Sequence, residues 1–425
     1  MTFLVGAKVE DATPTWPARL SGFAARRGLS IGAHDPISVR ALAVDDTCLI
    51  CIDVVGLDDE TCAQIRASSP FADDHVFVAA THTHGGPAVM NGHLGTYDRE
   101  ARQLIALAAV RAATGALRDR QPATLEFADA GPAPVATDRR RGGRPAEARM
   151  QALRWKSEAG TTIAWLATYP CHPVVLGPNN RLFTGDYPAA LRDRLEEVAP
   201  GSIAVFATGC AGDINVGHNA AASFSRAADL RRTFEEATRI GRLLANLVLN
   251  ANWCAIAEIS PTATRTEPVV LTTSPLDGRS VEMQRTEWQA QLDETIDEGH
   301  AAVLAEWIAW SATARASTKS SWVGSVSVVR WASVTLVFLP GEPFLQTAVE
   351  IARHSVSTAC LVLGYTNGCP GYLPPADAYG DGGYEVTDAH RYYGMPSPFS
   401  QGCAELLRDR AVDGMRELEG VSPRA

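Results

Sequence analysis

Two histidines separated by one residue follow an apolar segment that predicts a buried strand. The segment is His75–Ala80, and His82 and His84 come after it in the sequence Thr-His-Thr-His-Gly-Gly-Pro. In an extended chain, residues two positions apart point to the same side, so we expect the two imidazoles to project together beyond the strand. Imidazole suits Zn²⁺, and such a pair at a strand end is typical of zinc hydrolases. A hydrogen-bonded pair of loop histidines is the alternative interpretation.

Three more polar residues follow predicted strands in the same way. His172 lies between two prolines, Asp213 ends a Gly-Cys-Ala-Gly turn, and Glu342 follows Pro-Gly. Enzymes with α/β folds place their sites at the carboxyl ends of strands, so we expect these residues to share one rim with His82 and His84. For His172 alone, a hydrogen-bonded core histidine is the alternative.

The composition is that of an ordinary globular protein, because 46% of the 425 residues are hydrophobic and 20% are charged. The formal net charge of −10 argues against a nucleic-acid partner or an anionic membrane surface. No run of about 18 apolar residues predicts a membrane span, and the N-terminal segment lacks the pattern of a secretion signal. The nine cysteines form no dense framework, which suits a reducing compartment and predicts a cytoplasmic protein.

Short β-rich segments and helical segments alternate without a strict βαβ order. This predicts an α/β fold in which mixed β-sheets are flanked by helices, with the zinc site at strand ends. Leu49–Val55 is a predicted strand, Ser325–Pro340 contains two more, and Arg99–Leu117 is a predicted helix with one apolar face. The segment 281–316 has no proline and is expected to form one long helix, or two that break near Gly299.

Six motifs, in order along the whole chain, together resemble those of the neutral, non-lysosomal ceramidase family. Ala80–Pro87 resembles the ATHTHSGP motif of that family. The other five are Asp11–Pro14 with Gly22-Phe23 (DITP…G), Cys171–Pro173 with Asn180 and Asp186 (HP…N…D), Gly209–Asp213 (GxxGD), Pro340–Glu342 (PGE), and Gly364–Asn367 with Tyr372, Tyr379 and Tyr384-Glu385 (GYxN…Y…Y…YE).

The resemblance implies a single ceramidase-like catalytic domain over residues 1–425. Residues 281–316 would be a helical insertion in it, and the C-terminal β-sandwich of full-length ceramidases is not expected. The cofactor implied is one Zn²⁺ per chain. The implied zinc ligands are His82, His172, Glu342 and Tyr372.

The same resemblance implies the roles of the remaining site residues. His84 would be the general base that acts on a metal-bound water, and Tyr384 would donate a hydrogen bond to the developing oxyanion. Arg139, in Asp-Arg-Arg, resembles the NR motif of the family and is expected to bind a polar group of the substrate. We add His93, close after the histidine turn, and Asp213 to the predicted substrate-binding residues.

These residues predict a zinc-dependent amidohydrolase that cuts a C–N bond in an N-acyl or lactam-type small molecule. Ceramide itself is not expected, because Ile214-Asn215 stands where the ceramidases have Ser-Pro-Asn and because the chain ends soon after Glu385. The expected partner is the small-molecule amide, with no nucleic acid, no membrane span and an oligomer possible.

Two other hypotheses remain open on the sequence. In the first, Cys210 is the nucleophile of a cysteine hydrolase, with His172 or His84 as its base, because it lies where a predicted strand turns. In the second, the chain is a non-catalytic relative that binds a metal or a lipid. Zinc chelation, thiol alkylation and an assay on model amides separate the three.

Overall fold

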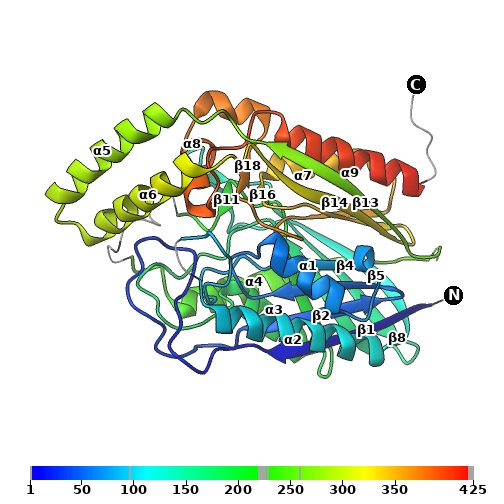
Figure 1. Ribbon diagram of the computed structural model, residues 1–425. Helices are drawn as coiled ribbons and strands as arrows, with labels where there is room; N and C mark the ends of the chain where they lie inside the picture. Colours follow the sequence, from blue (N-terminus) through cyan, green and yellow to red (C-terminus); the bar gives the residue numbers. More distant parts are fainter. Residues whose placement is uncertain (1, 95–96, 219–225, 227–228, 258–259, 420–425) are drawn as a thin grey trace.

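The computed structural model of the protein describes residues 2–94, 97–218, 226, 229–257 and 260–419. Two β-sheets pack face to face at its centre, and helices cover the outer face of each (Figure 1). Both sheets mix parallel and antiparallel strand pairs. The fold is therefore α/β with mixed sheets flanked by helices, as the sequence predicts.

The larger sheet has nine strands and contains most of the N-terminal half of the chain. Its strands, in spatial order, are β10 (Ile203–Thr208), β9 (Thr162–Tyr169), β8 (Arg149–Ser157), β5 (Gln121–Pro132), β1 (Phe3–Asp11), β2 (Ser38–Val44), β3 (Thr47–Ile52) and β4 (Val76–Ala80), with β12 (Trp253–Ala255) beside β5. Strands β2, β3 and β4 are buried along their whole length, which explains their nearly continuous apolar sequences.

The second sheet has four strands, and two small sheets lie near the site. The four strands, in spatial order, are β13 (Ala263–Thr272), β14 (Ser321–Trp331), β15 (Val334–Phe338) and β17 (Ala359–Leu363). The small sheets are β11 (Ile214–Asn215) with β6 (Thr137–Asp138) and β7 (Arg144–Pro145), and β16 (Glu342–Pro343) with β18 (Tyr372–Leu373).

The main core lies between the two large sheets. Phe77 of β4 stacks on Phe338 of β15 with 4.3 Å between ring centroids, and Trp155 of β8 meets the edge of Trp331 of β14 at 5.6 Å. Burial of such side chains contributes about 2 to 3 kcal/mol each relative to exposure. This core fixes the distance between the loops that leave the strand ends.

Helices pack on the outer faces of both sheets. They are α1 (Asp59–Ser68), α2 (Arg99–Arg118), α3 (Tyr187–Val198) and α4 (Phe234–Leu249) on the larger sheet, and α7 (Leu345–Ala352) and α9 (Cys403–Glu419) on the smaller one. The short α8 (Tyr384–Thr387) lies instead beside β18. Side-chain caps mark several starts: Asp98 accepts a hydrogen bond from the backbone N–H of Ala101 at the start of α2.

The segment 281–316 lies within two helices that project from one end of the molecule (Figure 1). They are α5 (Gly278–Glu294) and α6 (Glu298–Ala316), and Asp297 caps α6 by accepting a hydrogen bond from the N–H of His300. Helix α6 lies beside the site described below, since Trp307 donates its indole N–H to the Tyr392 hydroxyl at 2.8 Å. In the described part of the chain, no helix is long and apolar enough to cross a bilayer.

Candidate active site and metal centre

Two histidines and a glutamate from three different strand ends converge in the interior. Nε2 of His82, after β4, lies 3.3 Å from Oε2 of Glu342, and Nε2 of His172, after β9, lies 3.1 Å from the same oxygen. All three side chains are at most 1% exposed. The common rim expected for these residues therefore exists.

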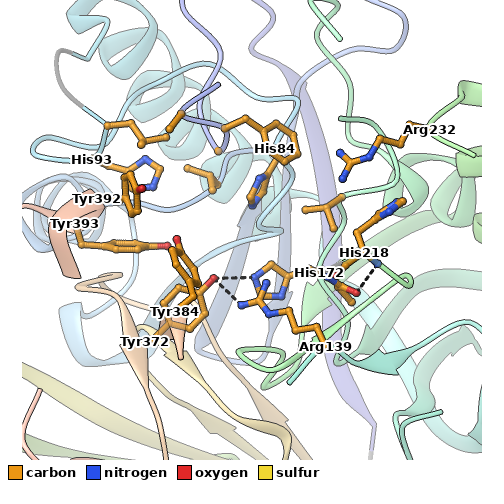
Figure 2. Close-up of a pocket in the computed structure, with 17 residues that line it drawn as sticks. His84, His93, Arg139, His172, His218, Arg232, Tyr372, Tyr384, Tyr392 and Tyr393 are labelled. Carbon is orange, nitrogen blue, oxygen red and sulfur yellow. Dashed lines mark hydrogen bonds between the residues drawn. The ribbon is translucent and has the colours of Figure 1, made fainter. Parts of the chain in front are cut away.

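A tyrosine and an arginine complete this group. Strands β16 and β18 pair in parallel and set Glu342 opposite Tyr372, whose hydroxyl lies 3.3 Å from Nε2 of His172. Nη2 of Arg139 donates to that hydroxyl at 3.0 Å (Figure 2) and also to the Gly212 carbonyl at 2.7 Å. All four zinc ligands expected from the resemblance thus lie together, with Arg139 in contact with one of them.

The hydrogen bonds of the two imidazoles decide which ring nitrogens face the group. Nδ1 of His82 lies 2.5 Å from the Val55 carbonyl, and Nδ1 of His172 lies 2.8 Å from the Ala211 carbonyl. A carbonyl only accepts, so each Nδ1 carries the proton and each Nε2 directs a lone pair toward Glu342. Two lone pairs and a carboxylate facing one point repel one another unless a cation lies between them, so the donor set fits a divalent metal.

His84 lies beside this group and completes a cluster of three histidines. Its Nε2 is 3.4 Å from Nε2 of His82, and the ligand atoms of His82, His84 and His172 lie within 4.8 Å of one another, close enough to hold a metal ion. The edge of Phe23 packs on the His84 ring, and Gly22 is required beneath it because a Cβ there would collide with the imidazole. This position suits His84 either as a further ligand or as the base that the resemblance implies.

Burial dominates the electrostatics of the cluster. It lowers the pKa of His84 well below its usual range, helped by the neighbouring His82 and His172. It also lowers the pKa of His172 to about 4, helped by Arg139. Burial alone would raise the pKa of Glu342, but the two histidines outweigh it and hold that pKa well below its ordinary value. These directions favour an ionised Glu342 and uncharged rings for His84 and His172.

The backbone that carries His82 differs from the sequence expectation. Strand β4 ends at Ala80, and His82 adopts a left-handed conformation with φ of 64°. The extended-chain reason for placing His82 and His84 on one side is therefore wrong, although their rings do meet. Left-handed backbone at a non-glycine residue costs about 1 to 3 kcal/mol and needs support from its surroundings.

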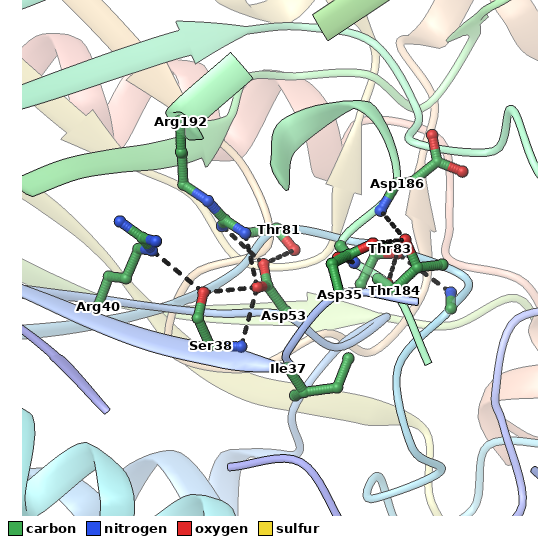
Figure 3. A network of polar contacts seen from close by, with 12 residues as sticks. Asp35, Ile37, Ser38, Arg40, Asp53, Thr81, Thr83, Thr184, Asp186 and Arg192 are labelled. Carbon is green, nitrogen blue, oxygen red and sulfur yellow. Dashed lines mark hydrogen bonds and ion pairs between the residues drawn. The ribbon is translucent and has the colours of Figure 1, made fainter. Parts of the chain in front are cut away.

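Two threonines that alternate with the histidines supply this support (Figure 3). Thr81 donates its hydroxyl to Asp53, and Thr83 donates to the Thr184 carbonyl at 2.9 Å. The Asp53 carboxylate is fully buried and forms two hydrogen bonds with the Arg192 guanidinium, at 2.8 and 2.7 Å. The Thr-His-Thr-His sequence thus anchors the turn through its threonines and presents its histidines to the site.

A pocket opens beside the three histidines and is lined by tyrosines on one side (Figure 2). We call Tyr372, Tyr384, Tyr392 and Tyr393 the tyrosine side. The Tyr393 hydroxyl donates to the second oxygen of Glu342, and the Tyr372 and Tyr384 ring centroids are 5.7 Å apart. Tyr384 therefore lies next to a candidate ligand, where the sequence expects it.

Comparison with solved structures identifies the architecture. Neutral ceramidase from Pseudomonas aeruginosa superposes with a TM-score of 0.76 and 16% sequence identity, covering 100% of this chain and 76% of that one. The chain has a neutral ceramidase-like fold. A structure of a ceramidase complexed with C2 matches at a TM-score of 0.73 and 14% identity, with 100% of this chain and 77% of that one covered. No family model matches the sequence, and no curated protein matches it.

Within this ceramidase-like fold, the predicted substrate-binding residues have different positions. Arg139 and His93 line the pocket, and His93 receives a hydrogen-bond partner in the Ser21 hydroxyl at 2.8 Å. Asp213 lines a second cavity next to this pocket, and its carboxylate accepts a hydrogen bond from the backbone N–H of Leu345 at the start of α7. That Asp213 contacts the substrate stays a prediction.

The Cys210 hypothesis does not fit its surroundings. The thiol is fully buried in an apolar cluster with Leu339 and Leu373, and it is not among the residues that line the pocket. Burial raises the pKa of the Cys210 thiol, which disfavours the thiolate that a cysteine nucleophile requires. A strand-to-turn position alone is a weak signal for a nucleophile.

Sequence reasoning assigned no role to three residues that belong to the site. Tyr393 contacts Glu342, Glu385 forms an ion pair with Arg139 at 2.8 Å, and Arg232 lines the pocket opposite the tyrosine side. Glu385 belongs to the Tyr384-Glu385 motif, so its position in a motif was the one signal that could have pointed to an ion pair with an arginine. Tyr393 ends a short 3-10 helix and Arg232 lies in a loop, and no local sequence pattern marks either residue. Only the tertiary structure brings them to the site.

The space beside the metal candidates is small and polar. The volume open to the centres of water-sized spheres is about 40 Å³, enough for a few water molecules. A neighbouring cavity of about 640 Å³ shares Arg139 and Tyr384 with it. That cavity is lined by charged residues such as Arg141, Asp377 and Asp381. Neither space is an apolar channel.

Proposed function

We propose that the protein is a zinc-dependent hydrolase of a C–N amide bond in a compact N-acyl or lactam-type molecule. The observation that carries the proposal is the convergence of two imidazole lone pairs, a carboxylate and a phenol on one buried point, with a third histidine beside it. The ceramidase-like fold supports the choice of an amide over other substrates, since the two solved structures compared above are ceramidases.

The proposed ligands of one Zn²⁺ per chain are His82, His172, Glu342 and Tyr372. Zinc in such a site supplies Lewis acidity, which polarises a carbonyl group and makes water nucleophilic at neutral pH. Arg139 has a positioning role in this proposal: its hydrogen bond holds the Tyr372 hydroxyl toward His172, and its ion pair with Glu385 fixes the guanidinium.

His84 is proposed as the group that moves the proton. Its Nε2 faces the metal candidates, while its Nδ1 is buried with no hydrogen-bond partner among the described residues. A neutral Nε2 can accept a proton from the attacking water and pass it to the leaving nitrogen. The water oxygen then bonds to the acyl carbon, the C–N bond breaks, and the products are a carboxylic acid and an amine.

Tyr384 is proposed as the donor that stabilises the oxyanion. Burial, with the neighbouring Tyr372 and Tyr392, raises the pKa of Tyr384 well above its ordinary value, so the phenol keeps its proton. A neutral phenol can donate a hydrogen bond to the carbonyl oxygen as negative charge develops on it. His93 and Arg139 are the proposed polar contacts of the bound substrate.

The small polar pocket supports a compact substrate over a long-chain ceramide. All nine cysteines lie in the described part of the chain and are free, and seven of them are buried. This supports the proposal that the protein works in a reducing compartment such as the cytoplasm.

The test is a panel of amides and esters assayed with purified protein before and after chelation and zinc reloading. Turnover that disappears with chelation, returns with Zn²⁺ and survives thiol alkylation supports the proposal. Hydrolysis that alkylation abolishes and chelation leaves intact would refute the zinc mechanism. One bound zinc without hydrolysis across the panel would favour the non-catalytic metal-binding relative.

A further inference from the structure

The pocket has two unlike sides, with the histidine cluster between them (Figure 2). Opposite the tyrosine side lie His218 and Arg232, and Asn215 donates its amide N–H to the His218 carbonyl. We call these three residues the basic side. Among the described residues that line the pocket there is no aspartate or glutamate. A concave surface with a guanidinium and no carboxylate attracts anions and repels cations.

The guanidinium of Arg232 is held in place by the shape of its surroundings. A Cβ at position 177 would collide with Nη1 of Arg232, so Gly177 provides the space that the side chain occupies. The guanidinium carbon lies 5.9 Å from the centroid of the Phe23 ring, and Phe23 also packs on His84. The next residue, Thr233, caps α4 and fixes the backbone. Arg232 is therefore directed into the pocket by built features.

Two carboxylates act on Arg232 from outside the pocket lining. Asp229 forms an ion pair with Arg231 at 3.2 Å and lies 3.6 Å from Nδ1 of His218. Asp186 accepts three backbone N–H groups, at 3.3, 3.0 and 2.7 Å, in the turn before α3. Both carboxylates temper the local positive charge, but neither belongs to the pocket lining.

A second buried guanidinium adds to the positive potential of this side. Arg26 lies 4.9 Å from the Phe23 ring, is 9% exposed, and donates Nη1 to the Ser21 carbonyl. Its Nε and Nη2 have no hydrogen-bond partner among the described residues. Burial lowers the pKa of Arg26 to about 9, as expected for a cation that no adjacent carboxylate compensates.

The proposed reaction orients an amide across these two sides. Its carbonyl oxygen faces Tyr384, and its nitrogen faces His84, which protonates the leaving amine. The acyl half then lies toward the tyrosine side, and the amine half extends past His84 toward Arg232. An anionic group on the amine half would be placed within reach of a guanidinium, the side chain best suited to carboxylate recognition.

We propose that the substrate is an N-acyl amino acid whose carboxylate is bound by Arg232, with Asn215 and His218 completing the contact. This inference rests on the proposed amidase function and names its substrate class. Water supplies oxygen to the acyl carbon and a proton to the nitrogen, so the products are a carboxylic acid and a free amino acid.

The experiment compares kcat/KM for N-hexanoylglycine and for N-hexanoylethanolamine. The first compound carries a carboxylate where the second carries a hydroxymethyl group. The wild type is expected to favour the acid, and Arg232→Gln should reduce this preference by about 10- to 100-fold, the usual range for a charge-assisted contact. Arg232→Lys should keep part of it. The matched control is Arg242→Gln, an exposed arginine of α4 that pairs with Glu197 outside the pocket lining, which should change the ratio by less than about twofold.

The outcomes separate this inference from the proposed function. Zinc-dependent hydrolysis of both compounds at equal kcat/KM would overturn the inference and leave the function standing. If neither is hydrolysed, the panel of amides and esters decides the proposed function, and calorimetric binding of the two compounds decides the inference. Tighter binding of the acid that Arg232→Gln abolishes would support it, and equal or undetectable binding would overturn it. Thermal unfolding of each variant verifies that it is folded.

Discussion

Oε2 of Glu342 lies 3.1 Å from Nε2 of His172, and both groups are almost fully buried. Because Nδ1 of His172 donates to backbone carbonyls, its Nε2 presents a lone pair to a carboxylate oxygen. Two electron-rich atoms at that distance in a dry interior are unfavourable on their own. The arrangement is explained if a cation occupies the space between them, and this contact is the basis of the predictions below.

Replacing either histidine ligand should remove the metal together with the activity. His82→Ala or His172→Ala removes one of the proposed zinc ligands. We therefore expect the zinc content to fall from one ion per chain to below about one tenth of an ion per chain. Elemental analysis of dialysed protein measures this. His354→Ala, on the exposed surface, is the matched control and should keep its zinc. Full occupancy in both ligand variants would contradict the assignment.

His84→Ala should separate metal binding from catalysis. We expect zinc to stay bound while kcat falls by about 100- to 10,000-fold, the usual range for loss of a general acid–base group. Zinc content and steady-state kinetics on the same preparation provide the two readouts. Near-normal turnover would remove His84 from the proton transfer, and loss of zinc would make it a ligand, as the three-histidine cluster also allows.

Tyr384→Phe should lower kcat more than it raises KM. The phenol acts on charge that exists only in the transition state, and loss of one such donor costs about 100- to 1,000-fold in kcat. The control is Tyr379→Phe, because the Tyr379 hydroxyl donates to the Phe399 carbonyl away from the metal candidates and does not line their pocket. Unchanged kcat in Tyr384→Phe would exclude it from the mechanism.

The ion pair beneath the histidine turn should carry a large share of stability. Asp53→Ala leaves the Arg192 guanidinium buried without its carboxylate, which we expect to cost about 3 to 5 kcal/mol of unfolding free energy. Breaking the exposed pair by Arg242→Ala should cost less than about 1 kcal/mol. Urea denaturation of both variants measures the difference, and equal losses would contradict the argument.

The same pair predicts a sign for the pH dependence of stability. Burial alone raises the pKa of Asp53, but Arg192 and Ser38 outweigh it and hold that pKa below its ordinary value. The carboxylate therefore contributes stability that is present above about pH 4 and is lost as the pH falls through the folded-state pKa. Urea midpoints at decreasing pH should fall more steeply for the wild type than for Asp53→Ala. Parallel curves would show that Asp53 does not contribute.

The fold class and the metal candidates could be predicted from the sequence, and other features could not. His82, His172 and Glu342 each follow an apolar strand, which is a local sequence pattern, and the structure brings these three residues together. Asp213 shows the same pattern with a different outcome, because its carboxylate accepts a backbone N–H of the next helix.

Other features of the site depend on contacts between residues far apart in the sequence, which local sequence patterns do not indicate. Arg232 reaches the pocket only because Gly177 leaves room for it, and the two residues are far apart in the sequence. The left-handed backbone of His82 depends on contacts made by the threonines on either side of it. That residues 1–425 form one catalytic domain stays a prediction.

The most direct test of the central claim is a zinc-edge anomalous diffraction map of zinc-loaded crystals. We predict one strong peak per chain between Nε2 of His82, Nε2 of His172 and the Glu342 carboxylate, about 2.0 to 2.2 Å from each. The Tyr372 hydroxyl should complete the set. Absence of a peak at that point from crystals grown with excess zinc, or a peak only at surface residues, would contradict the account.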